Sequence, residues 1–228
     1  MRNAPPDQWG ERMDSHLALP ELLAEAQRIA GEAVRVIAVD MPVALTPVRS
    51  RRRCDKAIST LFGANWCSTH SPTKERPGTI SDVFLNDAVN AGFSLKTTSS
   101  DDASPALLEV YPHVALLALC NSQYRLRYKL SRRRTYWPDR SAEEGREEIR
   151  REWVRILTSL KSKIDMDLEI DRDIKSQRAW KAWEDVIDAI VCCWVGLEWL
   201  SGRARPYGDV EAAIWVPASQ QGSVCDVA

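Results

Sequence analysis

The chain has 228 residues, of which 44% are hydrophobic and 28% are charged, and its formal net charge is -1. These values are typical of a folded globular protein, and they exclude disordered, collagen-like and low-complexity chains. No apolar run approaches the roughly 20 residues that a membrane-spanning helix needs. The first residues lack the apolar core of a signal peptide. We therefore expect a cytoplasmic protein with no membrane partner.

Apolar residues at helical spacing, often closed by glycine or proline, predict six helices. In chain order these are Leu17–Gly31, Cys54–Phe62, Ser81–Ala91, His113–Leu119, Ser141–Lys163 and Gln177–Leu200. The last segment is apolar on most of its surface, so we expect a buried helix. Its polar residues form one narrow wedge, because steps of three and four residues return to one side of a helix. They are Lys181, Glu184, Asp185 and Asp188.

Three short segments rich in apolar and β-branched residues, each stopped by proline, predict strands. They are Val34–Met41, Ala106–Tyr111 and Glu211–Val216. Strands that alternate with helices indicate an α/β fold with a mainly parallel central sheet. We expect one domain over residues 17–217, a polar N-terminal tail over 1–16 and a C-terminal tail over 218–228.

The six cysteines do not suggest a disulfide framework, because a chain of this length does not need one and Cys192 and Cys193 are adjacent in a predicted helix. We expect buried, reduced thiols. Cys54, Cys67 and His70 supply only part of a zinc site, with no convincing second pair of ligands. Structural zinc is therefore disfavoured.

Positive charge is concentrated in two segments without acids, Arg49–Arg53 and Arg125–Arg134. Aromatic residues interleave the second one, and this mixture suits a nucleic-acid strand held through phosphate contacts and base stacking. The candidate nucleic-acid-binding residues are Arg125, Arg127, Tyr128, Lys129, Arg132, Arg133 and Arg134. A solvated face that keeps an acidic protein in solution explains the pattern equally well.

Acidic residues stand where chemistry is expected. Asp40 and Glu109 end two predicted strands, at the edge where α/β sheets open their functional crevice. Asp185 and Asp188 lie one turn apart on the last helix. Converging carboxylates repel one another, and a divalent cation removes that repulsion. Oxygen ligands without histidine or cysteine favour Mg²⁺ or Mn²⁺, which suit phosphoryl transfer. Capping of helices and pairing with arginines is the alternative.

Several short strings occur in a specific order. They are VIAVDMP at 36–42, Arg53-Cys54-Asp55, Glu109-Val110-Tyr111-Pro112, Tyr128-Lys129, DVIDA at 185–189, Gly208-Asp209 and AIWVP at 213–217. Together they resemble the domain of unknown function 429 family, predicted RNase H-like nucleases, over Leu17–Pro217. The DVIDA string is similar to a motif in the last helix of RuvC-type Holliday-junction resolvases.

The resemblance implies a three-layer RNase H-like fold around a mainly parallel sheet. It also implies four candidate catalytic acids around divalent metal, namely Asp40, Glu109, Asp185 and Asp188. Of these, Asp40, Glu109 and Asp188 are the expected metal ligands, with Mg²⁺ or Mn²⁺ as the expected ion.

The family normally opens with a β-hairpin whose first strand carries a further site aspartate, whereas here a polar segment leads directly into the first predicted helix. We therefore expect the first strands to be missing or truncated, with activity weakened as a result. The sequence predicts a metal-dependent nuclease that hydrolyses phosphodiester bonds. A non-catalytic RNase H-like module that binds DNA or RNA is the alternative, and the oligomeric state stays open.

Overall fold

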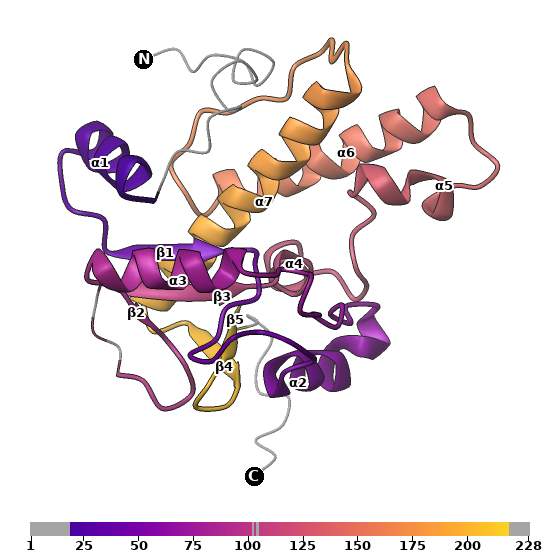
Figure 1. The fold of residues 1–228 in the computed structure, drawn as a ribbon. Coiled ribbons are helices and arrows are strands. Elements are labelled where there is room, and N and C mark those ends of the chain that lie inside the picture. The colour runs from indigo at the N-terminus through magenta and orange to yellow at the C-terminus, as the bar shows by residue number, and fades with distance from the viewer. Residues whose placement is uncertain (1–18, 102, 104, 219–228) are drawn as a thin grey trace.

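The structure is a computed structural model that describes residues 19–101, 103 and 105–218. Five strands form one sheet, and helices pack on both of its faces (Figure 1). The strands are β1 (Val36–Val39), β2 (Ser94–Leu95), β3 (Ala106–Val110), β4 (Ala204–Gly208) and β5 (Ala213–Pro217). The helices are α1 (Leu19–Ala30), α2 (Arg53–Phe62), α3 (Ile80–Asn90), α4 (Pro112–Leu119), α5 (Arg133–Tyr136), α6 (Ala142–Lys161) and α7 (Gln177–Leu200), with short 3-10 turns η2 (Gly63–Asn65) and η3 (Leu130–Arg132).

The sheet is mainly parallel, as predicted. Its main strand order is β1-β3-β5-β4, and β2 pairs with β3 beyond the end of β5. β1, β2 and β5 all run parallel to β3, and only β4 is antiparallel to its neighbour β5. The three predicted strands are confirmed. The structure adds β2 and β4, which the sequence did not predict.

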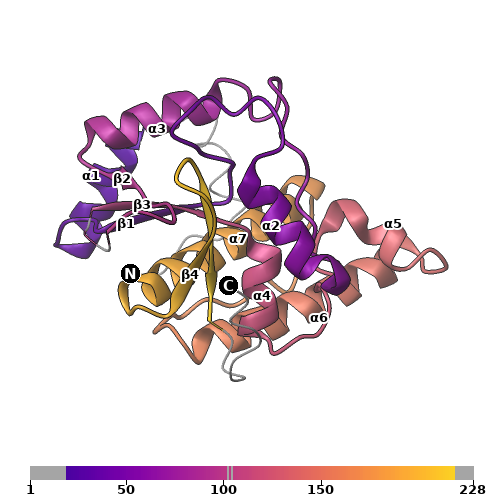
Figure 2. The same cartoon turned by 90° about the horizontal axis from the view of Figure 1, so that it is seen from below.

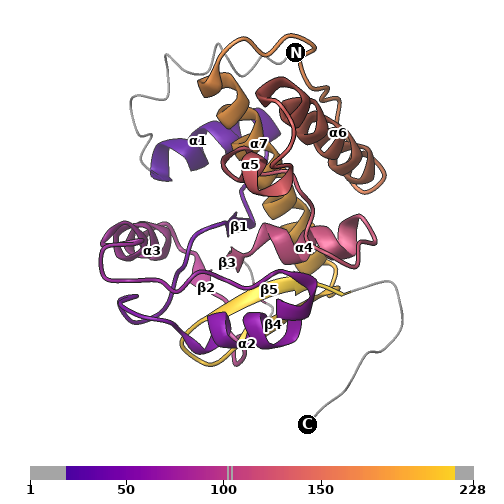
Figure 3. The same ribbon diagram turned by 90° about the vertical axis from the view of Figure 1, so that its right-hand side faces the viewer.

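The two faces of the sheet carry different helices. On one face, Ala106, Leu108 and Val110 of β3 pack with α4, α6 and α7 in the largest apolar cluster. On the other face, Leu107 belongs to a cluster with α1 and α3, while Ile214 of β5 packs with α2. Figure 3 shows α6 and α7 on one side of the sheet and α2 on the other, and Figure 2 shows α3 and α2 over separate parts. This arrangement has three layers.

Helix α7 lies close against β1. A Cβ on Gly196 would stand 3.3 Å from Val36 Cγ1 and 3.8 Å from Ala38 Cβ. Asp188 precedes Gly196 by about 12 Å of helix, and Asp40 follows Val36 by about 13 Å of strand. Because α7 runs opposite to β1, these matched lengths bring the two aspartates to the same end of the sheet.

The two outer strands of the main order differ in composition. β4 carries Arg205 and Pro206, whereas β1 consists of Val36, Ile37, Ala38 and Val39. Among the described residues, no strand pairs with the outer side of β1.

No helix within the described ranges has both the length and the apolar character needed to cross a bilayer. The predicted tails fall on residues 1–16 and 218–228, which lie outside the described residues except for Ala218. The same holds for the start of the first predicted helix and for the expectation that the first strands are missing.

Candidate metal centre

Three acids of α7 form a cluster at the end of the sheet where β1 finishes. Carboxylate oxygens of Glu184, Asp185 and Asp188 lie within 4.8 Å of one another, and this group could hold a metal ion. Glu184 and Asp188 are one turn apart on the side that packs into the protein, so they are only 3% and 7% exposed. Asp185 projects into solvent at the rim.

The chain segment before η3 crosses α7 at these acids. The Tyr128 hydroxyl donates a 2.7 Å hydrogen bond to Asp188 Oδ1, and Lys129 Nζ bonds to Asp188 Oδ2. The backbone N–H of Leu130 donates to Glu184 Oε2 at 2.6 Å. Trp153 Nε1 in turn donates to the Tyr128 carbonyl at 2.9 Å, which ties the segment to α6. The two buried acids are thus oriented by residues far away in sequence.

Lysines supply part of the balancing charge. Lys129 Nζ lies 3.8 Å from Glu184 Oε1 in addition to its bond with Asp188. Lys181 Nζ lies 2.9 Å from Glu184 Oε1 and 2.5 Å from Asp185 Oδ1. Two lysines therefore serve three carboxylates of α7, before Asp40 is added.

Asp40 faces this cluster from the end of β1. Surrounding protein and the Asp188 carboxylate raise the pKa of Asp40 to about 6, although its side chain still reaches solvent. Burial also raises the pKa of Asp188, against the opposing effect of Lys129 and Tyr128. Both aspartates raise the pKa of the Cys192 thiol as well, although burial is the larger cause. Four carboxylates against two lysines leave a formal charge of -2, the charge that one divalent cation would balance.

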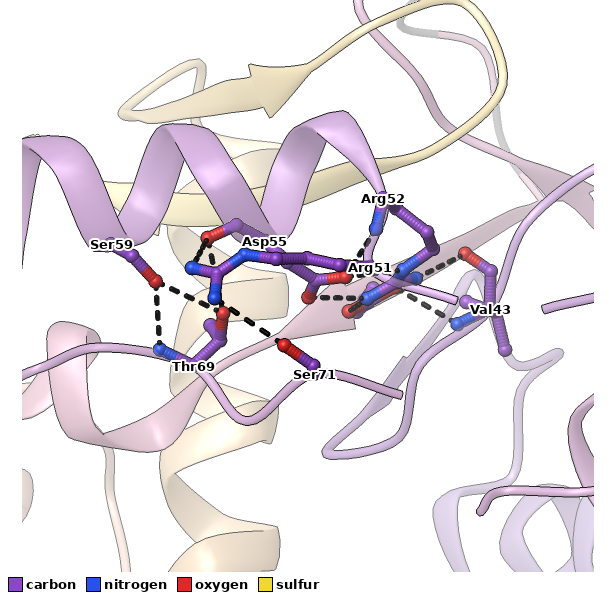
Figure 4. Close-up of polar contacts among 8 residues, drawn as sticks. Val43, Arg51, Arg52, Asp55, Ser59, Thr69 and Ser71 are labelled. Atoms are coloured by element: carbon purple, nitrogen blue, oxygen red, sulfur yellow. Dashed lines mark hydrogen bonds and ion pairs between the residues drawn. The ribbon is translucent and has the colours of Figure 1, made fainter. Parts of the chain in front are cut away.

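Glu109 has a different set of partners. Its two oxygens accept bonds of 2.5 and 2.6 Å from the Arg52 guanidinium, and Glu109 Oε2 also accepts from the Val43 N–H at 2.9 Å. Arg52 additionally binds Asp55 of α2 and the Val43 carbonyl (Figure 4). Burial raises the pKa of Glu109 to about 7, while Arg52 acts in the opposite direction.

The expected convergence of Glu109 with Asp40 and Asp188 is therefore absent from its contacts. The physical reason is the alternation of a strand, in which successive side chains point to opposite faces. Leu108 and Val110 face α7, so Glu109 between them faces α2. Cys54, Asp55 and Glu109 do lie within 4.8 Å of one another, but Arg52 already occupies both carboxylates.

The disfavoured zinc site gains no support, because neither Cys67 nor His70 belongs to a group of possible ligands among the described residues. Burial raises the pKa of Cys54 to about 12 and that of Cys67 to about 11, as expected for buried thiols. Cys192 is buried too, but Cys193 is exposed, so the expectation of buried thiols is wrong for that residue.

Within the basic segment, three candidate nucleic-acid-binding residues have other roles. Tyr128 is fully buried under the acids, so its ring cannot stack on a base. Lys129 is committed to Asp188, and Arg133 packs on Gly145 and donates to the Ala142 carbonyl at 2.9 Å. The remaining candidates reach solvent. They are Arg125, Arg127, Arg132 and Arg134.

Glu184 is the site residue that the sequence did not single out as a candidate. The available signal was its spacing from Asp188, because four residues place two side chains on one helix face more closely than the three residues that separate Asp185 from Asp188. The flanking pattern of Trp183 and Ile187 also marked this face as buried.

The family described as "Protein of unknown function (DUF429)" matches residues 85–212. No curated protein and no solved structure gives a significant match. The matched region includes β3, the segment that crosses α7, and all three acids of α7. Since it spans more than half of the chain, the protein belongs to the DUF429 family.

Proposed function

We propose that this protein is a metal-dependent nuclease with an RNase H-like fold that hydrolyses phosphodiester bonds. The observation that carries the proposal is the carboxylate cluster of Asp40, Glu184, Asp185 and Asp188 at the carboxyl end of β1. It has two formal negative charges in excess and lies beside a segment rich in arginine. The similarity of the DVIDA string to the last helix of RuvC-type resolvases supports the same reading.

The donor set fits Mg²⁺ or Mn²⁺. All candidate ligands are carboxylate oxygens, two of them are buried, and repulsion between Asp40 and Asp188 raises the pKa of Asp40. Asp40, Glu184 and Asp188 would hold the ion, with Asp185 at the rim. When bound, such an ion lowers the pKa of water and stabilises charge on a phosphate.

The residues around the cluster have roles of their own. The Tyr128 hydroxyl stays protonated, because burial and Asp188 raise its pKa well above the usual range, and it fixes one oxygen of Asp188. Lys129 holds the other oxygen. Arg125, Arg127, Arg132 and Arg134 lie on the same chain segment, where they would attract the phosphodiester backbone.

A non-catalytic module that binds nucleic acid is the second candidate. One observation favours it: Lys129 already bonds to Asp188, and Arg52 already neutralises Glu109. Acids that are paired in this way need no metal for charge balance. The two candidates differ in one measurable property, hydrolysis that depends on both divalent metal and Asp188.

The decisive experiment follows hydrolysis of end-labelled single-stranded, duplex and branched substrates with Mg²⁺, Mn²⁺ or EDTA. We compare the native chain with Asp188→Asn and Glu184→Gln. Glu198→Gln is the matched control, because Glu198 lies on the same helix but pairs with Arg203 away from the cluster. Each cluster variant should reduce the cleavage rate at least 100-fold, and the control should retain the native rate.

Metal-dependent cleavage that survives Asp188→Asn would assign the chemistry to another site. Tight binding of nucleic acid without cleavage under any metal condition would establish the binding module instead.

A further inference from the structure

A pocket of about 260 Å³ opens beside the basic segment, at a place that no sequence motif marks. It is lined by Trp66, Arg125, Arg127, Arg132, Thr135 and Tyr136. Trp66 follows η2, whereas the other five residues come from the segment before and within α5. The volume is below the range of about 300–1,000 Å³ that encloses drug-sized ligands. It suits a smaller unit such as a base or a phosphate group.

The pocket has a strong positive charge without compensation. Three of its lining residues are arginines and none is acidic. Among the described residues, none of these arginines has a carboxylate oxygen within 4.0 Å. Arg125 Nε is buried and has no hydrogen-bond partner there. A buried donor without a partner is costly, and an anion supplies the missing acceptor.

Trp66 is held in an unusual state at the rim. Its φ of 64° is in the left-handed region, which a tryptophan rarely adopts, and 56% of its surface is exposed. The Trp66 N–H donates to the Gly63 carbonyl at 2.9 Å, and the Cys67 N–H donates to the Phe62 carbonyl at 3.0 Å. Strained backbone of this kind is typical of functional positions.

The aromatic rim is fixed to the arginines. Trp66 stacks on Tyr124 with ring centroids 4.6 Å apart and an interplanar angle of 27°. The Arg125 N–H donates to the Asn65 carbonyl at 2.9 Å, and Asn65 Nδ2 donates to the Gln123 carbonyl at 2.7 Å. Two segments that are far apart in sequence thus present one rigid surface, which limits the entropy lost on binding.

The pocket is connected to the acid cluster by the chain itself. Leu126 and Tyr128 are buried, while the alternate residues Arg125, Arg127 and Lys129 retain contact with solvent. In extended chain, every second residue is separated by about 6–7 Å, so Arg125 and Lys129 are about 13 Å apart. A strand a few nucleotides long would reach from the pocket to the carboxylates.

We propose that this pocket holds one unpaired nucleotide of a single-stranded nucleic acid, with the base stacked on Trp66 and the phosphate paired with Arg125 and Arg132. The inference rests on the proposed function, because it names the substrate class of the same site. Paired bases within a duplex expose only their edges in the grooves, so a continuous duplex offers no base face to Trp66.

The test measures fluorescence anisotropy of a labelled 12-nucleotide single strand and of the matched blunt duplex, with the full chain in EDTA. The single strand should bind at least 10-fold more tightly. Trp66→Ala should weaken single-strand binding by about 5- to 100-fold, the loss expected for one stacked base, and should leave duplex binding unchanged. Trp66→Phe should restore most of the affinity. Leu61→Ala, an exposed apolar residue of α2 outside the pocket, is the matched control.

Salt dependence separates stacking from charge. Arg132→Gln should reduce the slope of log affinity against log salt by about 0.7, whereas Trp66→Ala should leave the slope unchanged. Equal binding of both probes, or single-strand affinity that is unaffected by Trp66→Ala, would overturn the pocket assignment while leaving metal-dependent cleavage intact. Absence of binding to either probe at low salt would contradict the proposed function itself.

Discussion

Asp40 has an electrostatic environment that opposes its own ionisation. Its pKa of about 6 in the folded protein exceeds the ordinary value near 4, so the folded state binds this proton more tightly than the unfolded chain does. The free energy of unfolding therefore falls as pH rises between about 4 and 6 and stays lowered above that window. Function at this site is maintained at the expense of stability.

We predict that Asp40→Asn raises the melting temperature at pH 7.5 in EDTA and abolishes stabilisation by Mn²⁺. Because the side chain reaches solvent, screening limits the gain to about 0.5–1 kcal/mol, or about 1–4 °C for a chain of this size. Thermal melts at pH 4 and pH 7.5 check the sign, since the difference should vanish at pH 4. Asp139→Asn, an exposed acid outside the cluster, should show no shift.

Arg52 holds two buried acids together, and its loss should be severe. We predict that Arg52→Leu lowers the free energy of unfolding by about 3–5 kcal/mol, because Glu109 and Asp55 would remain buried without their cation. Urea denaturation measures the change. The double variant Arg52→Leu/Glu109→Leu should recover much of the loss, and a single variant that costs under about 1 kcal/mol would refute this role.

Glu109 also provides a direct test of the metal ligands. Its partners face α2, so we predict that Glu109→Gln leaves Mn²⁺ affinity within about 3-fold of the native value, whereas Glu184→Gln reduces it at least 10-fold. Isothermal titration calorimetry with Mn²⁺ distinguishes the two. A large loss of affinity in Glu109→Gln would return this residue to the metal centre.

Sequence patterns located the acids better than they located their partners. The positions of Asp40 and Glu109 at strand ends follow from apolar runs and proline, but the face on which each side chain lies depends on strand register and on which helices cover each face. Apolar parity within Ala106–Val110 is uniform, so the sequence of β3 alone did not reveal that Glu109 faces α2. Tyr128 was misassigned for a similar reason, because an aromatic residue among arginines can point either way.

At the scale of elements, the approach of α7 to β1 sets the distance between Asp188 and Asp40. Gly196 permits that approach, since a side chain there would meet Val36. We predict that Gly196→Val lowers the free energy of unfolding by about 1–3 kcal/mol through overpacking and weakens Mn²⁺ binding as the acids move apart. Cys193→Val, an exposed change on the same helix, should do neither. Urea denaturation and calorimetry report the two effects.

The strands that the sequence missed are those with the weakest local signal. β4 reads Ala-Arg-Pro-Tyr-Gly, and its arginine, proline and glycine are typical of turns or edges rather than of a strand. β2 is only two residues long. Both form because neighbouring strands supply hydrogen-bond partners. In contrast, α7 and β3 were predictable because their apolar residues are numerous and continuous.

At the scale of the whole molecule, folding should not require metal. Lys129 and Lys181 partly neutralise the cluster, so we predict that the protein stays folded in EDTA. Mn²⁺ at about 100-fold above its dissociation constant should raise the melting temperature by about 5–10 °C, the shift produced by a ligand that binds only the folded state. Asp188→Asn should abolish the rise. Unfolding on chelation would show instead that the ion is structural.

The contrast between the two outer strands determines how this sheet can associate. Proline and arginine on β4 discourage the addition of a strand, whereas the outer side of β1 carries no such residue. If two copies joined through their β1 strands in an antiparallel manner, a twofold axis would relate them, and both outer strands of the continuous sheet would be β4. Such assembly closes after one step and cannot propagate into a fibre.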